Sequence, residues 1–385
     1  MSLSIDEVRW LIAHPHALGE ASELPLTKKS MLADSAALRQ EYGDMGRAVL
    51  EVAEARRSTA GKLPGEWVIS SEAAQQATPY SVATMRALRL VRDGRPVHDV
   101  TCSIGTEVSA LIDVGVPAMG SDLDFARLLM AQHNAPAPYA QADALTPVTS
   151  GHIIVADPAR RAGGRRIARP EDLLPALPDL VEAWAGHDMA IKCAPGLDFS
   201  EWTGEVAVTS VDGGVKEACL YTPGLAEPGV SRSAWVIRGQ SVDKYNDAMP
   251  DHCEVKPVGA YIIDPDGAVV RAGLVRHYAA AHGLWQLDER IAHLTGDAIP
   301  VGESGFEVLA QVPVKKVRQE LQARNCGAVE ILVRGVDLNP DMLRKQWKLR
   351  GDVQLAVIIS RIGKTAVAFI CRERQFNAGQ VFDRV

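Results

Sequence analysis

Four aspartates spaced along the first half of this 385-residue sequence have the clearest chemical pattern, and they are Asp99, Asp122, Asp143 and Asp157. A turn of small residues follows the first of them and closes on Gly105, after which apolar residues recur at helical spacing. Such a turn exposes backbone amides to a ligand. A carboxylate at the position of Asp122 can accept hydrogen bonds from both hydroxyls of a ribose. The pattern therefore predicts a nucleotide-type binding site.

The same turn lacks the features of two common phosphate-binding loops. A dinucleotide-binding turn has the pattern G-x-G-x-x-G, and a P-loop ends in Gly-Lys-Ser/Thr. The turn between Asp99 and Thr106 has one glycine and no lysine. It therefore serves neither a pyrophosphate nor a triphosphate well.

Strands and helices must bring these aspartates to one edge of a sheet. Between residues 97 and 222 short strands alternate with helical patterns, which predicts a mainly parallel, doubly wound sheet. Candidate strands end at Asp99, Asp122 and Asp157, and residues 204–221 read as a terminal hairpin with a glycine turn. Ligands of such sheets bind at the carboxyl ends of the strands, where the aspartates fall.

The order of these landmarks resembles that of the class I S-adenosylmethionine (SAM) dependent methyltransferases. The turn around Asp99 is similar to the first motif of that family, and Asp122, Asp143 and Asp157-Pro158 resemble its later motifs in the same order. The resemblance implies that SAM is the cofactor, that Asp122 binds its ribose and that Asp143 faces the adenine amino group. The cofactor-binding residues that it implies are Asp99, Thr101, Cys102, Gly105, Thr106, Asp122, Leu123, Asp143 and Ala144.

The residues after the fourth strand form the predicted acceptor side. In the family this position lies beside the transferred methyl group, so Asp157 is expected to accept a hydrogen bond from an N–H acceptor, while Arg160 and Arg161 bind a phosphate or stabilise the base. A helix N-cap for Asp157 and a solvated loop for the arginines are the open alternatives. Relatives that methylate exocyclic amines carry Pro-Pro and an aromatic residue after the acid. Ala159 and Arg160 stand in those places here, which argues against an adenine amino group as the acceptor.

Cys193 offers a different chemistry. RNA methyltransferases that act on carbon 5 of pyrimidines use a cysteine near the end of the fourth or fifth strand as nucleophile, and Lys192-Cys193-Ala194-Pro195 occupies such a place. A buried thiol in ordinary packing is the favoured alternative. Cys102 is expected to line the cofactor turn.

Four regions are predicted along the chain. Residues 1–92 form an N-terminal helical domain, whose last helix, with Thr78 as N-cap and Pro79 at its first position, is similar to the pre-core helix of the trimethylguanosine synthase type. Residues 93–222 form the methyltransferase core and residues 223–303 a linker and connecting region. Residues 304–385 resemble the α/β THUMP-like domain of a bacterial methyltransferase group. The predicted fold class is α/β, a Rossmann-like doubly wound class I methyltransferase sheet flanked by these two regions.

Composition restricts the remaining possibilities. The hydrophobic share of 47% and the charged share of 23% are those of an ordinary globular protein. No apolar run approaches the roughly 20 residues of a membrane helix, and the N-terminus lacks a signal-peptide pattern, so a cytoplasmic location without membrane contact is expected. The cysteines and histidines show no metal-ligand spacing, and no metal is predicted. The net charge is 41 minus 48, or −7, so any nucleic-acid contact must be local.

The sequence predicts a SAM-dependent methyltransferase that acts on a base nitrogen of structured RNA, either transfer or ribosomal RNA. The THUMP-like resemblance implies the RNA partner, and two basic clusters, Arg160–Arg169 and Lys315–Arg350, gain weight from it. Two alternatives stay open. One is a methyltransferase of a small molecule or protein, and the other is a non-catalytic RNA-binding protein with a degenerate SAM pocket.

Overall fold

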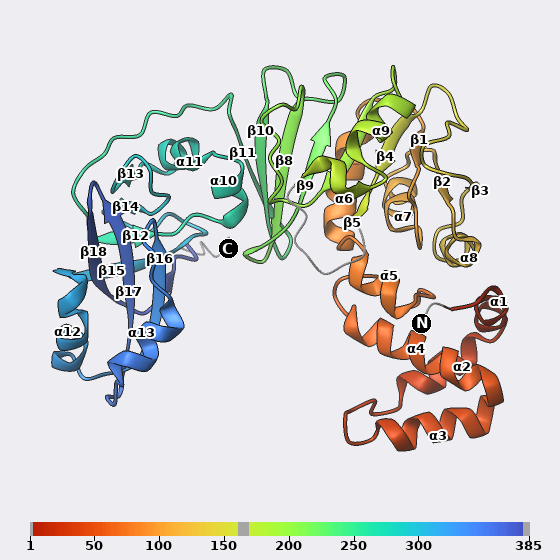
Figure 1. The fold of residues 1–385 in the computed structure, drawn as a ribbon, viewed down its shortest axis with the longest axis horizontal. Coiled ribbons are helices and arrows are strands. Elements are labelled where there is room, and N and C mark those ends of the chain that lie inside the picture. Colours follow the sequence, from red (N-terminus) through yellow and green to blue (C-terminus); the bar gives the residue numbers. More distant parts are fainter. Residues whose placement is uncertain (1–2, 161–168, 380–385) are drawn as a thin grey trace, which may run out of the picture. The chain divides into compact units, whose positions relative to one another are not determined.

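The computed structural model describes residues 3–160 and 169–379 of the chain, without the side chain of Arg160. The chain folds into two compact units (Figure 1), which are Met1–Val211 with Lys216–Pro228 and Asp212–Val215 with Gly229–Val385. The finer division into four regions stays a prediction. Within the described ranges no helix is long and apolar enough to cross a membrane.

The first unit begins with helices whose apolar faces form one core. Ser4 and Glu7 form a capping box at the first helix, and Ser70 caps a later one. Buried residues of these helices pack together with Ile104 and Met130 from the sheet region, so the helices rest directly on the half of the sheet that carries the first motif. The helices are α1 (Ile5–Ala13), α2 (Pro15–Ser22), α3 (Met31–Tyr42), α4 (Gly46–Ser58), α5 (Ser71–Gln76) and α6 (Tyr80–Leu90), with a 3-10 turn η1 (Gly43–Met45).

The sheet of the first unit has the strand order β8-β9-β7-β4-β1-β2-β3. Its strands are β1 (Val97–Asp99), β2 (Ala118–Asp122), β3 (Tyr139–Gln141), β4 (Ile153–Ala156), β7 (Met189–Cys193), β8 (Glu205–Val211) and β9 (Gly214–Tyr221). The strands β3, β2, β1, β4 and β7 are parallel, and β9 runs antiparallel to β7. The strand order reverses between β1 and β4, which is where doubly wound sheets bind ligands. The predicted doubly wound sheet with a terminal hairpin is confirmed.

Helices and a small ribbon complete the first unit. They are α7 (Thr106–Asp113), α8 (Phe125–Asn134), α9 (Leu177–Ala183), β5 (Ala159–Arg160), η2 (Pro170–Asp172) and β6 (Leu173–Leu174). Asp124 begins α8 by accepting hydrogen bonds from the amides of Ala126 and Arg127. Asn134 ends the same helix, and its side-chain amide donates to the carbonyls of Val68 and Ile104, at 3.1 Å each. This bridge fixes the N-terminal region beside the first turn of the sheet.

The second unit is a mixed sheet with the strand order β13-β14-β12-β15-β18-β17-β16. Helices α12 and α13 cover one face of it through Val317, Leu321, Leu343 and Trp347. Asn339 caps α13 by accepting hydrogen bonds from the amides of Asp341 and Met342. The elements are β10 (Arg232–Arg238), β11 (Ser241–Asn246), β12 (Tyr261–Ile263), α10 (Gly267–Arg271), α11 (Val275–His282), β13 (Trp285–Gln286), β14 (Leu294–Gly296), β15 (Ser304–Pro313), η3 (Val314–Lys316), α12 (Val317–Ala323), β16 (Cys326–Arg334), α13 (Pro340–Trp347), β17 (Val353–Ile362), β18 (Thr365–Arg372) and β19 (Gln375–Phe376).

A buried histidine gives the second unit a pH-dependent stability. His293 is 0% exposed and its Nδ1 lies 2.6 Å from the Ser360 hydroxyl; burial lowers the pKa of this imidazole to about 4. The folded-state pKa lies below the ordinary value, so the unfolded chain binds more protons between pH 4 and 6.5, and stability falls as the pH drops through that window. We expect the protonation of His293 in the unfolded chain to lower the free energy of unfolding by about 2 kcal/mol at pH 5 relative to neutral pH.

Urea unfolding at pH 7 and pH 5 checks this expectation on the wild type and on His293→Asn, whose amide keeps a donor near Ser360. The variant should lose about 2 kcal/mol less than the wild type between the two pH values. An equal loss in both proteins would show that other groups cause the pH dependence.

Candidate active site

The turn between β1 and α7 depends on a glycine. Gly105 has a φ of 86°, in the left-handed region that side chains rarely adopt. A Cβ at this position would lie 3.1 Å from the Tyr139 hydroxyl and 3.2 Å from the Cα of Ala131, closer than ordinary contacts. Glycine is therefore required both for the conformation and for the space. Gly105 itself lies behind the turn and does not line the cavity in front of it.

A cavity of about 410 Å³ opens at the carboxyl ends of the first unit's central strands, in front of this turn. The segment Gln76–Thr78 before α6 lines its other side. The structure brings together nine of the predicted site residues around it, which are Asp99, Thr101, Cys102, Thr106, Asp122, Leu123, Asp143, Ala144 and Asp157. Their individual roles toward a ligand stay predictions.

Backbone amides hold the aspartates of this cavity in place. Asp122 accepts hydrogen bonds from the amides of Ser103 (3.0 Å) and Asp124 (2.9 Å), one on each carboxylate oxygen. Asp143 accepts one from the amide of Leu145 (2.9 Å) in the same manner. Among the described residues no cationic side chain pairs with either of these two carboxylates, so their negative charge acts on the cavity that they line.

Negative charge is in excess around the cavity. Its lining carboxyl groups are Asp99, Glu107, Asp122, Asp143, Asp157 and Asp179, and Arg127 is the one cation among the described lining residues. Burial raises the pKa of Asp99 well above its ordinary value, which favours a protonated carboxyl at that position. Arg127 already forms an ion pair with Glu72 at 3.0 Å. The cavity therefore favours a cationic ligand over an anion.

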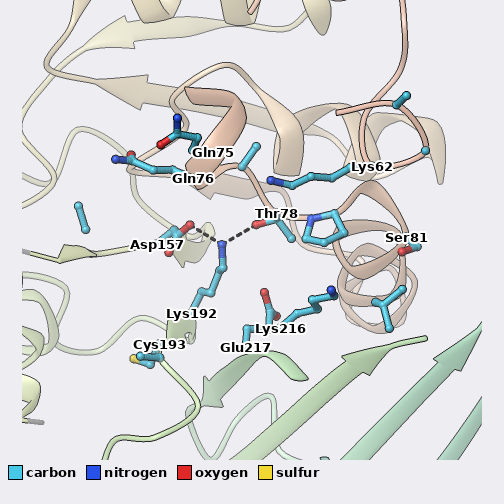
Figure 2. Close-up of a pocket in the computed structure, with 17 residues that line it drawn as sticks. Lys62, Gln75, Gln76, Thr78, Ser81, Asp157, Lys192, Cys193, Lys216 and Glu217 are labelled. Atoms are coloured by element: carbon cyan, nitrogen blue, oxygen red, sulfur yellow. Dashed lines mark hydrogen bonds and ion pairs between the residues drawn. The ribbon is translucent and has the colours of Figure 1, made fainter. Parts of the chain in front are cut away.

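A second cavity, of about 780 Å³, adjoins the first. The two share lining from Gln76–Thr78, Asp157 and Ala159, so the Asp157 side chain lies on their common wall. Three lysines line the second cavity, Lys62, Lys192 and Lys216 (Figure 2). One cavity is thus acidic and its neighbour carries several ammonium groups.

Lys192 of β7 connects Asp157 to the segment before α6. Its Nζ lies 2.6 Å from a carboxylate oxygen of Asp157 and 2.7 Å from the hydroxyl of Thr78, as the dashed lines in Figure 2 show. Burial alone would lower the pKa of Lys192, but the negative charges of Asp157 and Glu217 outweigh it and raise the pKa. The ammonium therefore stays protonated and orients the carboxylate of Asp157.

This contact corrects one sequence prediction and reveals a missed residue. Thr78 is not an N-cap, because α6 begins at Tyr80 with Pro79 before it, and the Thr78 hydroxyl accepts a hydrogen bond from Lys192 instead. From the sequence alone, Lys192 is notable only as the neighbour of Cys193. A lysine inside an otherwise apolar strand was the available signal, since a buried ammonium needs a partner.

The alternative of a helix N-cap for Asp157 is also wrong, because the strand β5 follows it. The amide of Asp157 donates to the Thr101 hydroxyl at 2.7 Å, which ties the fourth strand end to the first. Arg160 lies in β5, paired with Leu173, and its side chain is not among the described ones. Arg161 lies outside the described residues, so the roles predicted for both arginines stay predictions.

Comparison with known proteins decides the family. Two proteins of Mycobacterium tuberculosis, from strains CDC 1551 / Oshkosh and ATCC 25618 / H37Rv, are each 47% identical to this chain over 359 residues, which is 87% of this chain and 99% of the relative. Both are named uncharacterized S-adenosylmethionine-dependent methyltransferases. The chain belongs to the SAM-dependent methyltransferases. It is an enzyme, and its cofactor is SAM.

Two further comparisons agree with this family. The THUMP domain-like family matches residues 304–373 of the methyltransferase, as the resemblance implied. The crystal structure of a candidate methyltransferase from Porphyromonas gingivalis W83 superposes with a TM-score of 0.73 at 17% identity, over 94% of this chain and 98% of that one. That likeness shows that the two chains share a fold over nearly their whole length.

The residues of the acidic cavity fit SAM, which supplies an electrophilic methyl group on a positively charged sulfonium when it is bound. Glu107 in α7 lines this cavity and is 7% exposed. Its Oε1 accepts no hydrogen bond from the described residues and has only an ion pair with Arg86, at 3.5 Å. A buried carboxylate that is compensated so weakly favours a cationic ligand in the cavity beside it. Asp122 can receive ribose hydroxyls on the lone pairs that its two amide contacts leave free.

Cys193 lines the second cavity of this methyltransferase and is the candidate nucleophile of the covalent alternative. It is 5% exposed, and burial raises the pKa of its thiol well above the ordinary value. A nucleophilic cysteine requires the thiolate, which this environment disfavours. We expect Cys193→Ala to retain methyl transfer within about threefold, measured as the initial rate at saturating SAM. A loss of about 1000-fold or more would instead identify Cys193 as the nucleophile.

Proposed function

We propose that this methyltransferase modifies a base nitrogen of structured RNA, either transfer or ribosomal RNA. The observation that carries the proposal is the lysine-lined cavity next to the cofactor cavity, with Asp157 on the wall between them. Its volume of about 780 Å³ lies in the range of cavities that enclose whole small ligands, so a nucleotide has room there. The resemblance of the C-terminal domain to THUMP modules supports RNA as the source of that nucleotide.

Lys62 and Lys216 are the groups proposed to meet phosphate. Neither forms an ion pair with a carboxylate within residues 3–160 and 169–379, whereas Lys192 is neutralised by Asp157. Burial, and after it the positive charges of Lys192 and Lys216, lower the pKa of Lys62. A phosphate would relieve this repulsion, since contacts to phosphate oxygens are the main source of affinity for nucleic acids.

Asp157 is proposed to receive the acceptor's N–H. Lys192 binds its Oδ2, and the side chain remains 40% exposed, so the other oxygen is available toward the cavity. Methyl transfer is an in-line displacement, and the protein must align the acceptor and remove its proton. In this proposal Asp157 takes the hydrogen bond and then the proton, and Lys192 keeps the carboxylate turned toward the acceptor.

The second unit carries exposed basic residues that support an RNA partner. They lie on and beside α12 and α13, the helices that cover one face of its sheet. Arg344 is paired with Asp341 at 2.7 Å, so it contributes less than the others. The others are Lys315, Lys316, Arg318, Lys345, Lys348 and Arg350, all exposed and without an ion pair among the described residues.

Transfer of labelled methyl groups tests the substrate class. The purified full chain is incubated with methyl-labelled SAM and, separately, with total RNA, with protein and with small metabolites from cells that lack the enzyme. We expect label in RNA, falling at least about tenfold between 50 and 200 mM salt because phosphate contacts are screened. Label confined to protein or metabolites would overturn the proposal and favour the alternative substrate classes. If SAM binds and none of the three fractions is labelled, the RNA proposal also fails.

A further inference from the structure

A buried ion-pair triad extends between the two cavities of the first unit. Arg86 of α6 is 4% exposed, and its Nη2 lies 2.5 Å from Glu217 Oε1 and 3.5 Å from Glu107 Oε1. Its Nη1 also donates to Glu217, at 3.1 Å. Glu107 lines the acidic cofactor cavity, whereas Glu217 lines the lysine-lined acceptor cavity. One guanidinium therefore contacts a carboxylate from each site.

Each glutamate keeps one oxygen without a hydrogen bond inside the protein. These are Oε1 of Glu107 and Oε2 of Glu217, whose residues are 7% and 2% exposed, and neither atom has a partner among the described residues. The Arg86–Glu107 contact is thus an ion pair without hydrogen-bond geometry. Such oxygens are rare in folded proteins because their desolvation is not offset by a hydrogen bond. Both atoms are covered by protein, so they act on a ligand in the adjoining cavity through their negative charge and not through a direct hydrogen bond.

The charges of the triad do not cancel. Two carboxylates share one guanidinium. Glu217 holds it with two hydrogen bonds and also lies in the field of the Lys192 ammonium, so Glu107 is the less compensated of the two carboxylates. The remaining negative charge therefore lies on the cofactor side. SAM carries a positive sulfonium, whereas its demethylated product, S-adenosylhomocysteine, has a neutral thioether.

We propose that the Glu107–Arg86–Glu217 triad sets the preference of this enzyme for SAM over S-adenosylhomocysteine, through the uncompensated carboxylate of Glu107. Methyl transfer removes the cation that Glu107 attracts, so the product is held less tightly than the substrate cofactor and is released. The inference rests on the cofactor and is independent of the acceptor's identity.

The triad also predicts an effect at a distance. Glu217 lines only the acceptor cavity, yet neutralising it would leave Arg86 free to compensate Glu107 and would weaken the attraction for SAM.

Calorimetry of SAM and S-adenosylhomocysteine on the full chain tests the proposal. In Glu107→Gln the ratio of the two dissociation constants should shift about tenfold against SAM, and in Glu217→Gln about threefold in the same direction. Glu205→Gln is the matched control, because Glu205 is a buried glutamate paired with Arg89 at 2.6 Å that lines neither cavity. Its ratio should stay at the wild-type value.

An unchanged ratio in a folded Glu107→Gln would overturn the proposal, and an unchanged ratio in Glu217→Gln would overturn the coupling through Arg86. Thermal unfolding establishes whether each variant is folded. If neither variant folds, the wild type carries the test with a SAM analogue that has a protonated amine in place of the sulfonium. This analogue should bind more tightly than S-adenosylhomocysteine, and equal or weaker binding would contradict the proposal.

Discussion

Replacing Lys192 by methionine is expected to lower the rate of methyl transfer at least about 100-fold, while the affinity for SAM stays within about threefold. Among the described residues the ammonium is the only hydrogen-bond partner of the Asp157 carboxylate, and it also donates to the Thr78 hydroxyl. Without it the carboxylate loses its orientation toward the acceptor. Single-turnover rates at saturating SAM and RNA, together with calorimetry of SAM, give the two quantities.

Lys216→Met is the control for this effect. Lys216 lines the same cavity, but the ion pair with Asp157 is made by Lys192. Its loss should raise the KM for RNA and change kcat little, as expected for a group that contacts phosphate. Similar kinetic effects of the two variants would show that the lysines act only as a positive surface. A full rate in Lys192→Met would remove Lys192 from the site.

Replacing Asp122 by alanine is expected to weaken the binding of SAM at least about 30-fold, because the carboxylate that is predicted to accept hydrogen bonds from the ribose hydroxyls is lost together with its charge. Both of its oxygens are held by amides of the surrounding turns, at 3.0 and 2.9 Å, so the group is preorganised before the ligand arrives. Calorimetry of SAM checks the loss, and thermal unfolding of the ligand-free protein checks that the turns survive.

Asp122→Ala should weaken S-adenosylhomocysteine by the same factor, because both ligands carry the same ribose. This outcome separates it from Glu107→Gln, which should change the ratio of the two affinities. If Asp122→Ala left both affinities near the wild-type value, Asp122 would not be the residue that binds the ribose.

The parts of this fold that the sequence predicts well are those that local patterns determine. Apolar strands that end at Asp99, at Asp122 and just before Asp157 follow from short apolar runs bounded by turn residues. The parallel order of the sheet follows from the alternation of strands and helices along the chain. The turn of small residues that closes on Gly105 is also apparent from the sequence, and Gly105 has a positive φ of 86° in the structure.

The parts that escaped prediction depend on contacts between distant segments. Lys192 meets Asp157 from 35 positions away, and Arg86 meets Glu217 from 131 positions away. No periodicity links the two members of such a pair. In the sequence, each of these residues is therefore indistinguishable from an ordinary charged residue of a strand or helix. Thr78 is the opposite case. The local rule for helix caps predicts that its side chain caps α6, but in the structure the Thr78 hydroxyl accepts a hydrogen bond from Lys192, which is distant in the sequence.

The central claim is that SAM and an RNA nucleotide meet across Asp157, and nucleosides from living cells test it most directly. Mass spectrometry would compare digests of transfer and ribosomal RNA from cells without this enzyme, with the wild type restored and with Lys192→Met restored. We expect one nucleoside that carries a methyl group on a base nitrogen. This nucleoside should be missing without the enzyme, return with the wild type and not return with the variant. Identical nucleosides in all three strains, or full recovery with Lys192→Met, would contradict it.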